Sequence, residues 1–405
     1  MMKTFPLKTL TAAMLMAGSG SALAIEAASM DLGGVQFTPV LNLSETYDDN
    51  FRAVGAGADE SSWITTINPS FELAAKDRLN VYKLTYAFSS DTFHSSHDDN
   101  NVDHHLDADA HMEFNARNRL DLNAGYSKME DVSDTEGGAG INDKYHTYNV
   151  GAVYGFGAQS ATMNFEFAAN QQWLRYDNEQ RLGNGPRINE DQERDTTTFS
   201  GTAFYRLAPK TRALFEVRYN DYDYKLGSST LDSDAMAYLL GLTWDATAKT
   251  SGIAKLGYSN KEFDDSNRED VSGSIWEVGV NWQPRTYSTF SLNTRRSVEE
   301  GSENTFNPDV EDAIDTTRTG INWNHEWTSR VSSDVGYTYI EEDYEGIDRK
   351  DETDEFGLGL NYELRRWVDV GVGYKYQDVE SKGVNTSSAD TYDRNIFMVK
   401  LTMGL

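Results

Sequence analysis

The sequence predicts an all-β protein, a transmembrane antiparallel up-and-down β-barrel of about 18 strands within a range of 16 to 18. Polarity alternates with a period of two along many stretches between residues 35 and 405. Tight turns recur roughly every 40 residues, the length of two membrane-crossing strands and one longer loop. The third observation is an N-terminal leader that directs the chain out of the cytoplasm.

The first 24 residues have the parts of a secretory signal peptide. A basic start precedes an apolar run from Leu10 to Ala17, and the segment ends in Ala22-Leu23-Ala24, the pattern that signal peptidase reads. The run is shorter than the roughly 20 apolar residues of a spanning helix. We therefore expect a signal peptide over residues 1–24, a short periplasmic segment over residues 25–34 and a barrel over residues 35–405.

Composition narrows the classes of function. The chain has 38% hydrophobic and 12% aromatic residues and a mean hydropathy of -0.62, too polar for a helical membrane protein but rich in residues that favour strands. Its net charge of -29 repels phosphate backbones, so we expect no nucleic-acid partner. The absence of cysteine excludes disulfides and thiolate metal sites.

Alternation is clearest in three stretches, Leu120 to Ser127, Thr162 to Ala169 and Trp276 to Trp282, where apolar and polar residues fall on opposite faces. The predicted tight turns are Lys76-Asp77-Arg78, Arg117-Asn118-Arg119, Gly157-Ala158-Gln159, Pro209-Lys210, Ala248-Lys249, Pro284-Arg285, Ser329-Arg330 and Arg365-Arg366. The opposite loops are expected to be long and acidic: Asp48 to Ser61, Asp91 to Asn101, Glu130 to Asp143, Asp177 to Arg194, Glu299 to Asp312 and Glu341 to Asp351. This asymmetry is typical of the bacterial outer membrane, with turns in the periplasm and loops outside.

The chain ends in an amphipathic segment from about Arg394 to Leu405. Its apolar face comprises Phe397, Val399, Leu401, Met403 and Leu405. Such a strand can close on the first one, and it is similar to the C-terminal strand by which the barrel-assembly machinery recognises outer-membrane proteins, although an aromatic residue is usual at its end. A soluble β-sandwich or β-helix is the alternative fold.

If the apolar faces contact lipid, the polar faces line a hydrated lumen that passes polar solutes. The predicted lumen-lining residues are Lys83, His105, Asp107, Asp109, His111, Glu113, Glu166, Glu216, Arg218, Lys255, Glu277, Arg295, Arg318, Asp334 and Asp369. The series from His105 to Glu113 could suggest a divalent metal. Successive residues on one face lie about 7 Å apart, however, so we expect hydrated wall and neither metal nor cofactor.

Catalytic motifs are missing from the sequence. No G-x-S-x-G, H-E-x-x-H or glycine-rich phosphate loop occurs, and His94 and His97 lie near Ser95 and Ser96 in an acidic loop where such residues are common. We therefore expect no enzyme. The acidic loops are either solvated surface or weak divalent-cation sites that bridge to lipopolysaccharide. Nine aromatic residues near the loop ends are expected in a membrane-interface girdle or against sugars: Tyr47, Trp63, Tyr145, Trp173, Tyr222, Tyr224, Tyr339, Tyr344 and Tyr392.

One segment carries a family resemblance. Residues 37–52 read FTPVLNLSETYDDNFR, followed by Ser62-Trp63-Ile64 and by Asn68-Pro69-Ser70-Phe71. This order resembles the β-barrel porin type 2 family, and its most specific part contains the motif residues Tyr47, Asp48, Asp49 and Asn50. Beyond about residue 130 only the rhythm of strands continues the resemblance. For the motif residues, a turn and a functional role are both open.

The resemblance implies an 18-stranded outer-membrane exit for exopolysaccharide or capsular polysaccharide, working with periplasmic export machinery. A general or substrate-selective diffusion porin for small polar solutes is the alternative, and a structural or adhesive surface barrel is a third. The expected partners are outer-membrane lipid and lipopolysaccharide, the barrel-assembly machinery, and a polysaccharide or small polar solute in the lumen.

Overall fold

The computed structural model of the chain describes residues 29–132, 142–158, 160–177, 187, 189–247, 249–301, 312–384, 386 and 391–404. The expected signal peptide lies outside these residues, as does Leu405. Among the described residues, no helix is long and apolar enough to cross a membrane.

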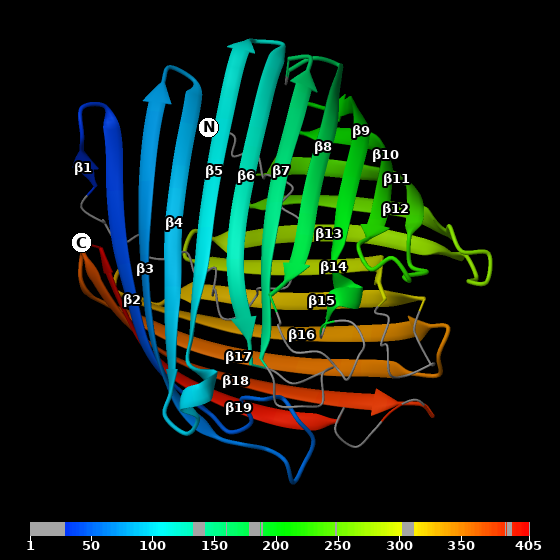
Figure 1. The fold of residues 1–405 in the computed structure, drawn as a ribbon. Coiled ribbons are helices and arrows are strands. Elements are labelled where there is room, and N and C mark those ends of the chain that lie inside the picture. Colours follow the sequence, from blue (N-terminus) through cyan, green and yellow to red (C-terminus); the bar gives the residue numbers. More distant parts are fainter. Residues whose placement is uncertain are drawn as a thin grey trace.

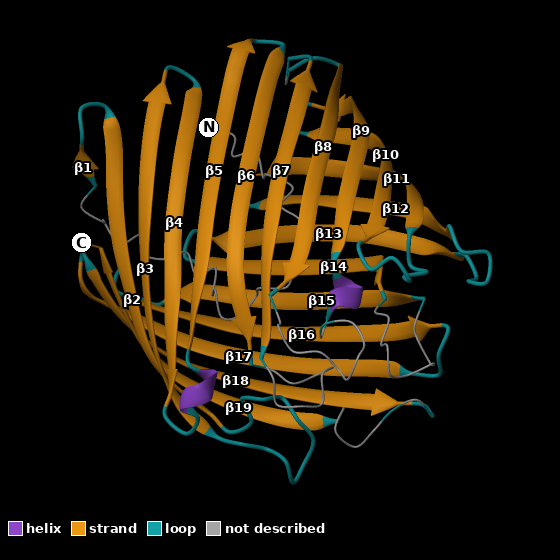
Figure 2. Cartoon of the chain, viewed as in Figure 1, coloured by secondary structure: helices purple, strands orange, loops and turns teal. Residues whose placement is uncertain are grey.

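Alternating polarity produces strands almost throughout the described chain (Figure 2). The strands are β1 (Met30–Asp31), β2 (Val35–Asp48), β3 (Ser62–Asp77), β4 (Asn80–Phe93), β5 (Asn101–Asn115), β6 (Asn118–Asp131), β7 (Asp143–Phe156), β8 (Met163–Tyr176), β9 (Arg194–Ala208), β10 (Thr211–Tyr224), β11 (Ser233–Thr247), β12 (Thr250–Phe263), β13 (Val271–Arg285), β14 (Ser288–Glu300), β15 (Ala313–Glu326), β16 (Val331–Glu345), β17 (Lys350–Arg365), β18 (Val368–Lys382) and β19 (Tyr392–Gly404). Two single-turn 3-10 helices are η1 (His97–Asp99) and η2 (Glu190–Gln192).

The strands form one closed sheet. Each strand from β2 to β18 pairs antiparallel with the next strand in the sequence, and β19 pairs with β2, so 18 strands close the barrel. The two-residue strand β1 is an addition to the start of β2. In Figure 1 the wall from β2 to β8 runs steeply while the facing wall from β14 to β18 runs nearly level, as tilted strands on opposite sides of a barrel do. The predicted fold and strand number are confirmed.

Connections alternate in length around the barrel. At one end, residues 78–79, 116–117, 209–210, 286–287 and 366–367 join neighbouring strands. Each connection lies within two residues of a predicted tight turn, and for the turn predicted at Pro284-Arg285, which ends β13, the connection follows directly after. At the other end, residues 49–61, 177–193 and 301–312 separate strands by much longer stretches. The alternation of short and long connections matches the expected asymmetry. Which end of the barrel faces the periplasm stays a prediction.

One predicted long loop is wrong. Strands β16 and β17 continue to Glu345 and from Lys350, so only residues 346–349 connect them. Cross-strand ion pairs compensate the acidic residues here: Lys350 Nζ lies 3.1 Å from Glu341 on β16, and Lys382 Nζ on β18 lies 2.7 Å from Glu352. This hairpin therefore extends as an ordered β-ribbon into the region that the sequence assigned to a loop.

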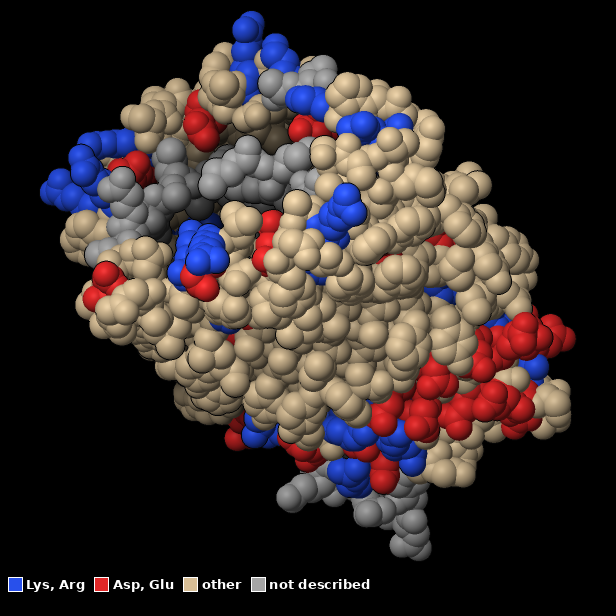
Figure 3. Space-filling model, turned by 90° about the horizontal axis from the view of Figure 1, so that it is seen from above, with Lys and Arg blue, Asp and Glu red and all other residues tan. Residues whose placement is uncertain are grey.

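The outer face carries the exposed apolar side chains. Leu240 and Leu256, which are register partners on β11 and β12, are 66% and 64% exposed. Directly paired residues lie on the same side of a sheet, so this apolar face continues from strand to strand. Figure 3 shows a wide region of uncharged surface between zones rich in Lys, Arg, Asp and Glu. An apolar belt of this kind is suited to lipid.

Aromatic contacts occur at both edges of the belt. Near the long loops, the rings of Tyr47 and Trp63 lie 5.2 Å apart. Near the short turns, Trp282, Phe290 and Trp323 form a continuous stack with centroid separations of 5.3 and 5.9 Å. Aromatic rings favour the two membrane interfaces because one part of each ring system is apolar and the other tolerates water.

We predict that the long loops face the cell exterior. Epitope tags inserted after Gly57 and after Gly301, which lie at the long-loop end, should bind antibody on intact cells. A tag after Lys249, in a short turn, should bind antibody only after the outer membrane is permeabilised. Labelling in the reverse order would show that the barrel is inserted the other way round.

Candidate functional site

The candidate site is the lumen wall, formed by the face opposite the apolar belt. In β12, for example, Leu256 points to the belt, so Lys255 points inward. The same alternation places all 15 predicted lumen-lining residues on the inward face. The structure brings some of them together into contacts and leaves others apart.

Four predicted residues form one buried ionic cluster, the lumen quartet of Glu216, Arg218, Lys255 and Glu277. Lys255 Nζ lies 2.7 Å from Glu216 Oε2 and 2.9 Å from Glu277 Oε2. Arg218 Nη2 lies 2.6 Å from Glu216 Oε1, and its Nη1 lies 3.0 Å from Glu277 Oε1. Glu216 and Lys255 are only 2% and 4% exposed. Each carboxylate oxygen therefore has a cationic partner, as buried charges require.

Two further arginines follow the quartet along the same row of register partners. In the strand register, Glu277 is opposite Arg295, and Arg295 is opposite Arg318. Among the described residues, no carboxylate lies within ion-pair distance of either arginine. The inward face of β14 and β15 therefore carries two neighbouring cationic groups, the arginine pair, without a direct ion pair, although Glu342 on β16 is near enough to Arg318 to interact with it electrostatically.

The opposite wall is acidic. On β5, the predicted residues His105, Asp107, Asp109, His111 and Glu113 occupy alternate positions. His111 Nδ1 contacts Asp121 Oδ1 at 2.5 Å and His111 Nε2 lies 3.6 Å from Glu113, while His105 Nδ1 lies 3.0 Å from Ser127 Oγ. These contacts tie each histidine to its own neighbour. Within the described ranges, no group of three or more His, Asp and Glu side chains is arranged to hold a metal ion.

The remaining predicted lumen residues lie apart from one another. Lys83 pairs with Glu72 at 3.2 Å, although Asp109 is its register partner. Glu166 pairs with Arg119 at 2.5 Å. Asp334 accepts a bond of 3.4 Å from Asn361, and Asp369 Oδ1 has no hydrogen-bond partner within the described residues.

The nine aromatic residues near the long loops divide between the two faces. Tyr47, Trp63, Trp173 and Tyr339 share the outward face with the apolar belt. Five tyrosines take the inward positions: Tyr145, Tyr222, Tyr224, Tyr344 and Tyr392. The girdle interpretation therefore fits only the first group. The second group, the mouth tyrosines, gives the lumen entrance aromatic surfaces on several strands.

A buried ion pair that was not predicted from the sequence lies at the same mouth. Lys261 is 2% exposed, and its Nζ lies 2.5 Å from Glu300. The hydroxyl of Tyr224 donates to the same carboxylate at 3.0 Å, and the Lys261 ammonium lies 4.9 Å from the ring centroid of Tyr222. Since Lys261 is six residues from Lys255 in an alternating strand, parity alone could have identified it as inward.

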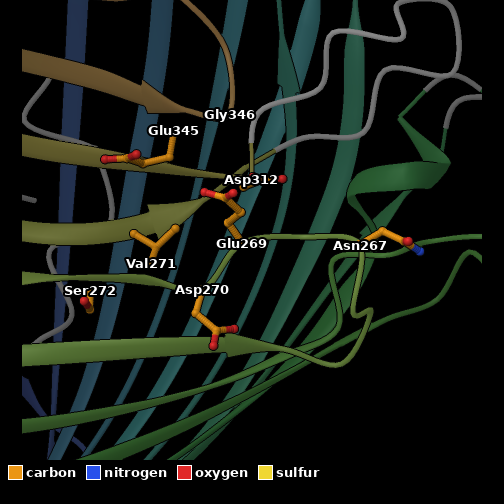
Figure 4. A pocket seen from close by; sticks show the side chains of 8 residues that line it. All are labelled: Asn267, Glu269, Asp270, Val271, Ser272, Asp312, Glu345 and Gly346. Atoms are coloured by element: carbon orange, nitrogen blue, oxygen red, sulfur yellow. The ribbon is translucent and has the colours of Figure 1, made fainter.

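An acidic pocket lies beside this mouth (Figure 4). Glu269 and Asp270 line it from the connection between β12 and β13, Asp312 lines it from the residue before β15, and Glu345 lines it from the end of β16. Asp312 is ion-paired with Arg268. The carboxylates are thus partly compensated, and the pocket adds negative charge at the long-loop end of the lumen.

The family-motif residues lie at the seam where the barrel closes. The Asp48 carboxylate accepts bonds from Arg394 on β19, at 2.8 Å from Nε and 2.5 Å from Nη2. Asp49 accepts bonds from Asn395, at 2.6 Å from the backbone N and 2.8 Å from Nδ2. Asn50 donates to the Asp393 carbonyl at 3.3 Å. Three consecutive side chains therefore join the first barrel strand to the last.

The histidine and serines noted in the second long loop do not form a nucleophile and base. His94 Nε2 lies 2.8 Å from Thr65 Oγ1 and 3.7 Å from Glu45. The backbone N of Ser95 donates to Ser62. Both contacts tie the loop to β3, so their role is structural.

A closed 18-stranded barrel with an apolar outer belt and a polar inner wall is a porin-like outer-membrane channel. The chain belongs to the family described as Putative beta-barrel porin 2, whose model matches residues 24–404. The fold and family are those of porins and barrel transporters, and no catalytic family is indicated. No curated protein matches the sequence.

Several solved structures are similar to the chain. The FrpB iron transporter from Neisseria meningitidis is 9% identical with a TM-score of 0.48, over 87% of this chain and 63% of FrpB. OpdO from Pseudomonas aeruginosa is 14% identical with a TM-score of 0.47, over 91% and 97% of the two chains. OccAB4 from Acinetobacter baumannii is 11% identical with a TM-score of 0.47, over 93% and 99%. The chain thus spans less than two thirds of the length of FrpB.

Proposed function

We propose that this channel is the outer-membrane exit for a secreted polysaccharide. The observation that carries the proposal is the inward wall, which combines polar groups of both charge signs with the mouth tyrosines. Sugars recognise such a surface, because their hydroxyls exchange bonds with water for bonds to polar side chains and their apolar ring faces cover aromatic rings. The family resemblance between residues 37 and 71 supports the same function.

Passage requires that the wall bind weakly. A hydrogen bond exchanged between water and protein contributes only about 0.5–1.5 kcal/mol, so a sugar chain can move between polar groups without being trapped. The lumen quartet is internally neutral, since two carboxylates face two cations. Because the charges of the quartet cancel, this part of the wall does not hold a charged polymer strongly.

The proposal also requires open space beside the lumen wall. The inward glycines on β13 and β17 show where such space exists, because an added Cβ atom there either has room or meets a neighbour. A Cβ atom added at Gly357 would meet no atom within 4 Å. At Gly279 it would lie 3.2 Å from Asn293 Oδ1, a contact that a small side-chain shift relieves. At Gly359 it would lie 2.4 Å from Asp334, so a larger residue there would disturb the wall itself. Gly357 is therefore a suitable position at which to obstruct the lumen.

We predict that deletion of the gene abolishes or strongly reduces secreted polysaccharide and leaves the uptake of small nutrients unchanged. Expression of the wild-type chain should restore secretion, whereas Gly357→Trp should restore it poorly because the indole projects into the lumen. Leu358→Trp is the matched control, since this neighbour is exposed on the lipid-facing side. Secreted hexose, cell-associated polysaccharide and the amount of folded barrel in outer-membrane fractions would be measured together.

The alternative outcomes are distinct. Normal secretion combined with lost uptake of a small solute would replace the proposal with a diffusion porin, which the same hydrated wall would suit. Normal secretion and normal uptake, with altered surface adhesion, would indicate a structural or adhesive barrel.

A further inference from the structure

Two adjacent arginines on the described lumen wall have no ion-pair partner, and we call this position the arginine station. Along one row of register partners, the inward residues are Lys255, Glu277, Arg295 and Arg318. Glu277 uses Oε1 for Arg218 and Oε2 for Lys255. Glu277 is thus directed to Arg218 and Lys255, and within the described residues it forms no ion pair with Arg295, its register partner on β14. On its other side, Arg295 is opposite a second arginine, Arg318.

The polar atoms around the arginine pair are also incompletely satisfied. Nε of Arg295 and Oγ1 of Thr316 are buried and have no hydrogen-bond partner within the described part of the chain. Thr316 is 7% exposed and lies two residues from Arg318 on the same face of β15. An unmatched guanidinium donor and a hydroxyl beside a second guanidinium favour a ligand that supplies hydrogen-bond acceptors and negative charge.

The opposite wall strengthens this preference. Strand β5 is nine strands from β14 in a closed ring of 18, so Asp107 and Asp109 lie on the wall facing Arg295. Asp109 and Arg295 also lie at similar distances from the short-turn end of the barrel. Asp109 is six residues from that end of β5, and Arg295 is seven residues from that end of β14. The resulting transverse field pushes an anion away from β5 and toward the arginine pair.

We propose that Arg295 and Arg318 bind carboxylate groups on the transported chain, which makes the substrate an acidic polysaccharide built from uronate-type sugars. Guanidinium groups recognise carboxylates through two parallel hydrogen bonds, and two adjacent arginines suit neighbouring acidic groups of a polymer better than one isolated acid. The polymeric part of this inference rests on the proposed export function. Carboxylate binding itself does not, because a small acid could use the same groups.

The test uses the purified full barrel in a planar lipid bilayer. The probes are an oligomer of a uronic acid, the corresponding monomer and a neutral glucose oligomer of equal length, each added during recording of ionic current. For Arg295→Ala/Arg318→Ala, we expect the concentration of uronate oligomer needed for half block to rise about tenfold, as expected when charge-assisted bonds are lost. The reversal potential in a salt gradient should also shift toward cations, and block by the glucose oligomer should not change.

Arg296→Ala is the matched control, because Arg296 is the next residue on the same strand, points outward and pairs with Asp315 at 2.9 Å. It should leave block and selectivity at wild-type values. Arg295→Lys/Arg318→Lys should retain the reversal potential but weaken block, because lysine keeps the charge without the planar pair of donors. The shift from folded to unfolded mobility on heating in gels confirms that each variant forms a barrel.

Unchanged block by the uronate oligomer in the folded double alanine variant would overturn the inference. Equal half-block concentrations for the uronate monomer and oligomer in the wild-type channel would assign the station to small acids and overturn the polymer assignment. If the alanine variant loses uronate block while the gene deletion leaves secretion normal, the station stands and the export function fails. If deletion abolishes secretion but uronate block is insensitive to both arginines, export stands and the station fails.

Discussion

Asp48→Ala should destabilise the closed barrel by about 3–5 kcal/mol, the usual effect of removing one partner from a buried ion pair. Asp48 is 1% exposed, and Arg394 approaches it with two nitrogens at 2.5–3.0 Å. The two residues are 346 positions apart in the sequence. Their contact therefore fixes the seam on which closure of the whole ring depends, and its loss leaves the Arg394 guanidinium without its carboxylate.

The measurement is equilibrium unfolding by urea in lipid vesicles, followed by the fluorescence of the eight tryptophans. Glu60→Ala is the control, because Glu60 also pairs with an arginine, Arg52 at 3.4 Å, but its side chain is 58% exposed. Exposed pairs contribute about 1 kcal/mol or less. A double-mutant cycle with Arg394→Ala separates the pair from other effects, and a coupling free energy near zero would refute the seam interpretation.

This seam shows what the sequence could and could not reveal. The closing strand was predictable, because Phe397, Val399 and Leu401 alternate with polar residues in a segment long enough to cross the membrane. The function of the motif was not predictable, since Asp48, Asp49 and Asn50 are common in turns. Their partners become neighbours only when the two ends of the chain meet, and no local pattern encodes that contact.

The structure of the lumen wall was likewise only partly predictable from the sequence. Parity was sufficient to place Lys255 and Glu277 on the inward face, because a period of two depends only on local sequence. Their pairing depends on the strand register, and a shift by two residues would preserve every face while separating them. The mouth tyrosines were ambiguous for another reason. Near a strand end the alternating pattern gives way to the loop. The sequence therefore placed residues such as Tyr224 and Tyr344 near the long-loop end of the barrel, but it did not show whether they point inward or outward.

Breaking the lumen quartet should have the second large effect on stability. Lys255→Met keeps the length of the side chain and removes its charge, which leaves Glu216 and Glu277 to share Arg218. Because Glu216 is 2% exposed, water cannot stabilise the uncompensated carboxylate. We expect a loss of about 3–5 kcal/mol, the range for removal of one member of a buried ionic group.

A rescue variant distinguishes charge balance from packing. In Lys255→Met/Glu216→Gln, one carboxylate and one cation are both absent, so the remaining Glu277 and Arg218 can pair and the wall is neutral again. This double variant should recover more than half of the lost stability, since replacing both partners of a buried pair is far less costly than removing one.

The same denaturant titration in vesicles checks this prediction against a matched control. Lys83→Met makes an identical substitution at a pair whose two side chains are 46% and 36% exposed, and it should cost about 1 kcal/mol or less. A quartet that acts only by packing would behave differently: Glu216→Gln would then add its own destabilisation to that of Lys255→Met. Recovery of stability in the double variant therefore requires that the four charges of the quartet balance one another inside the wall.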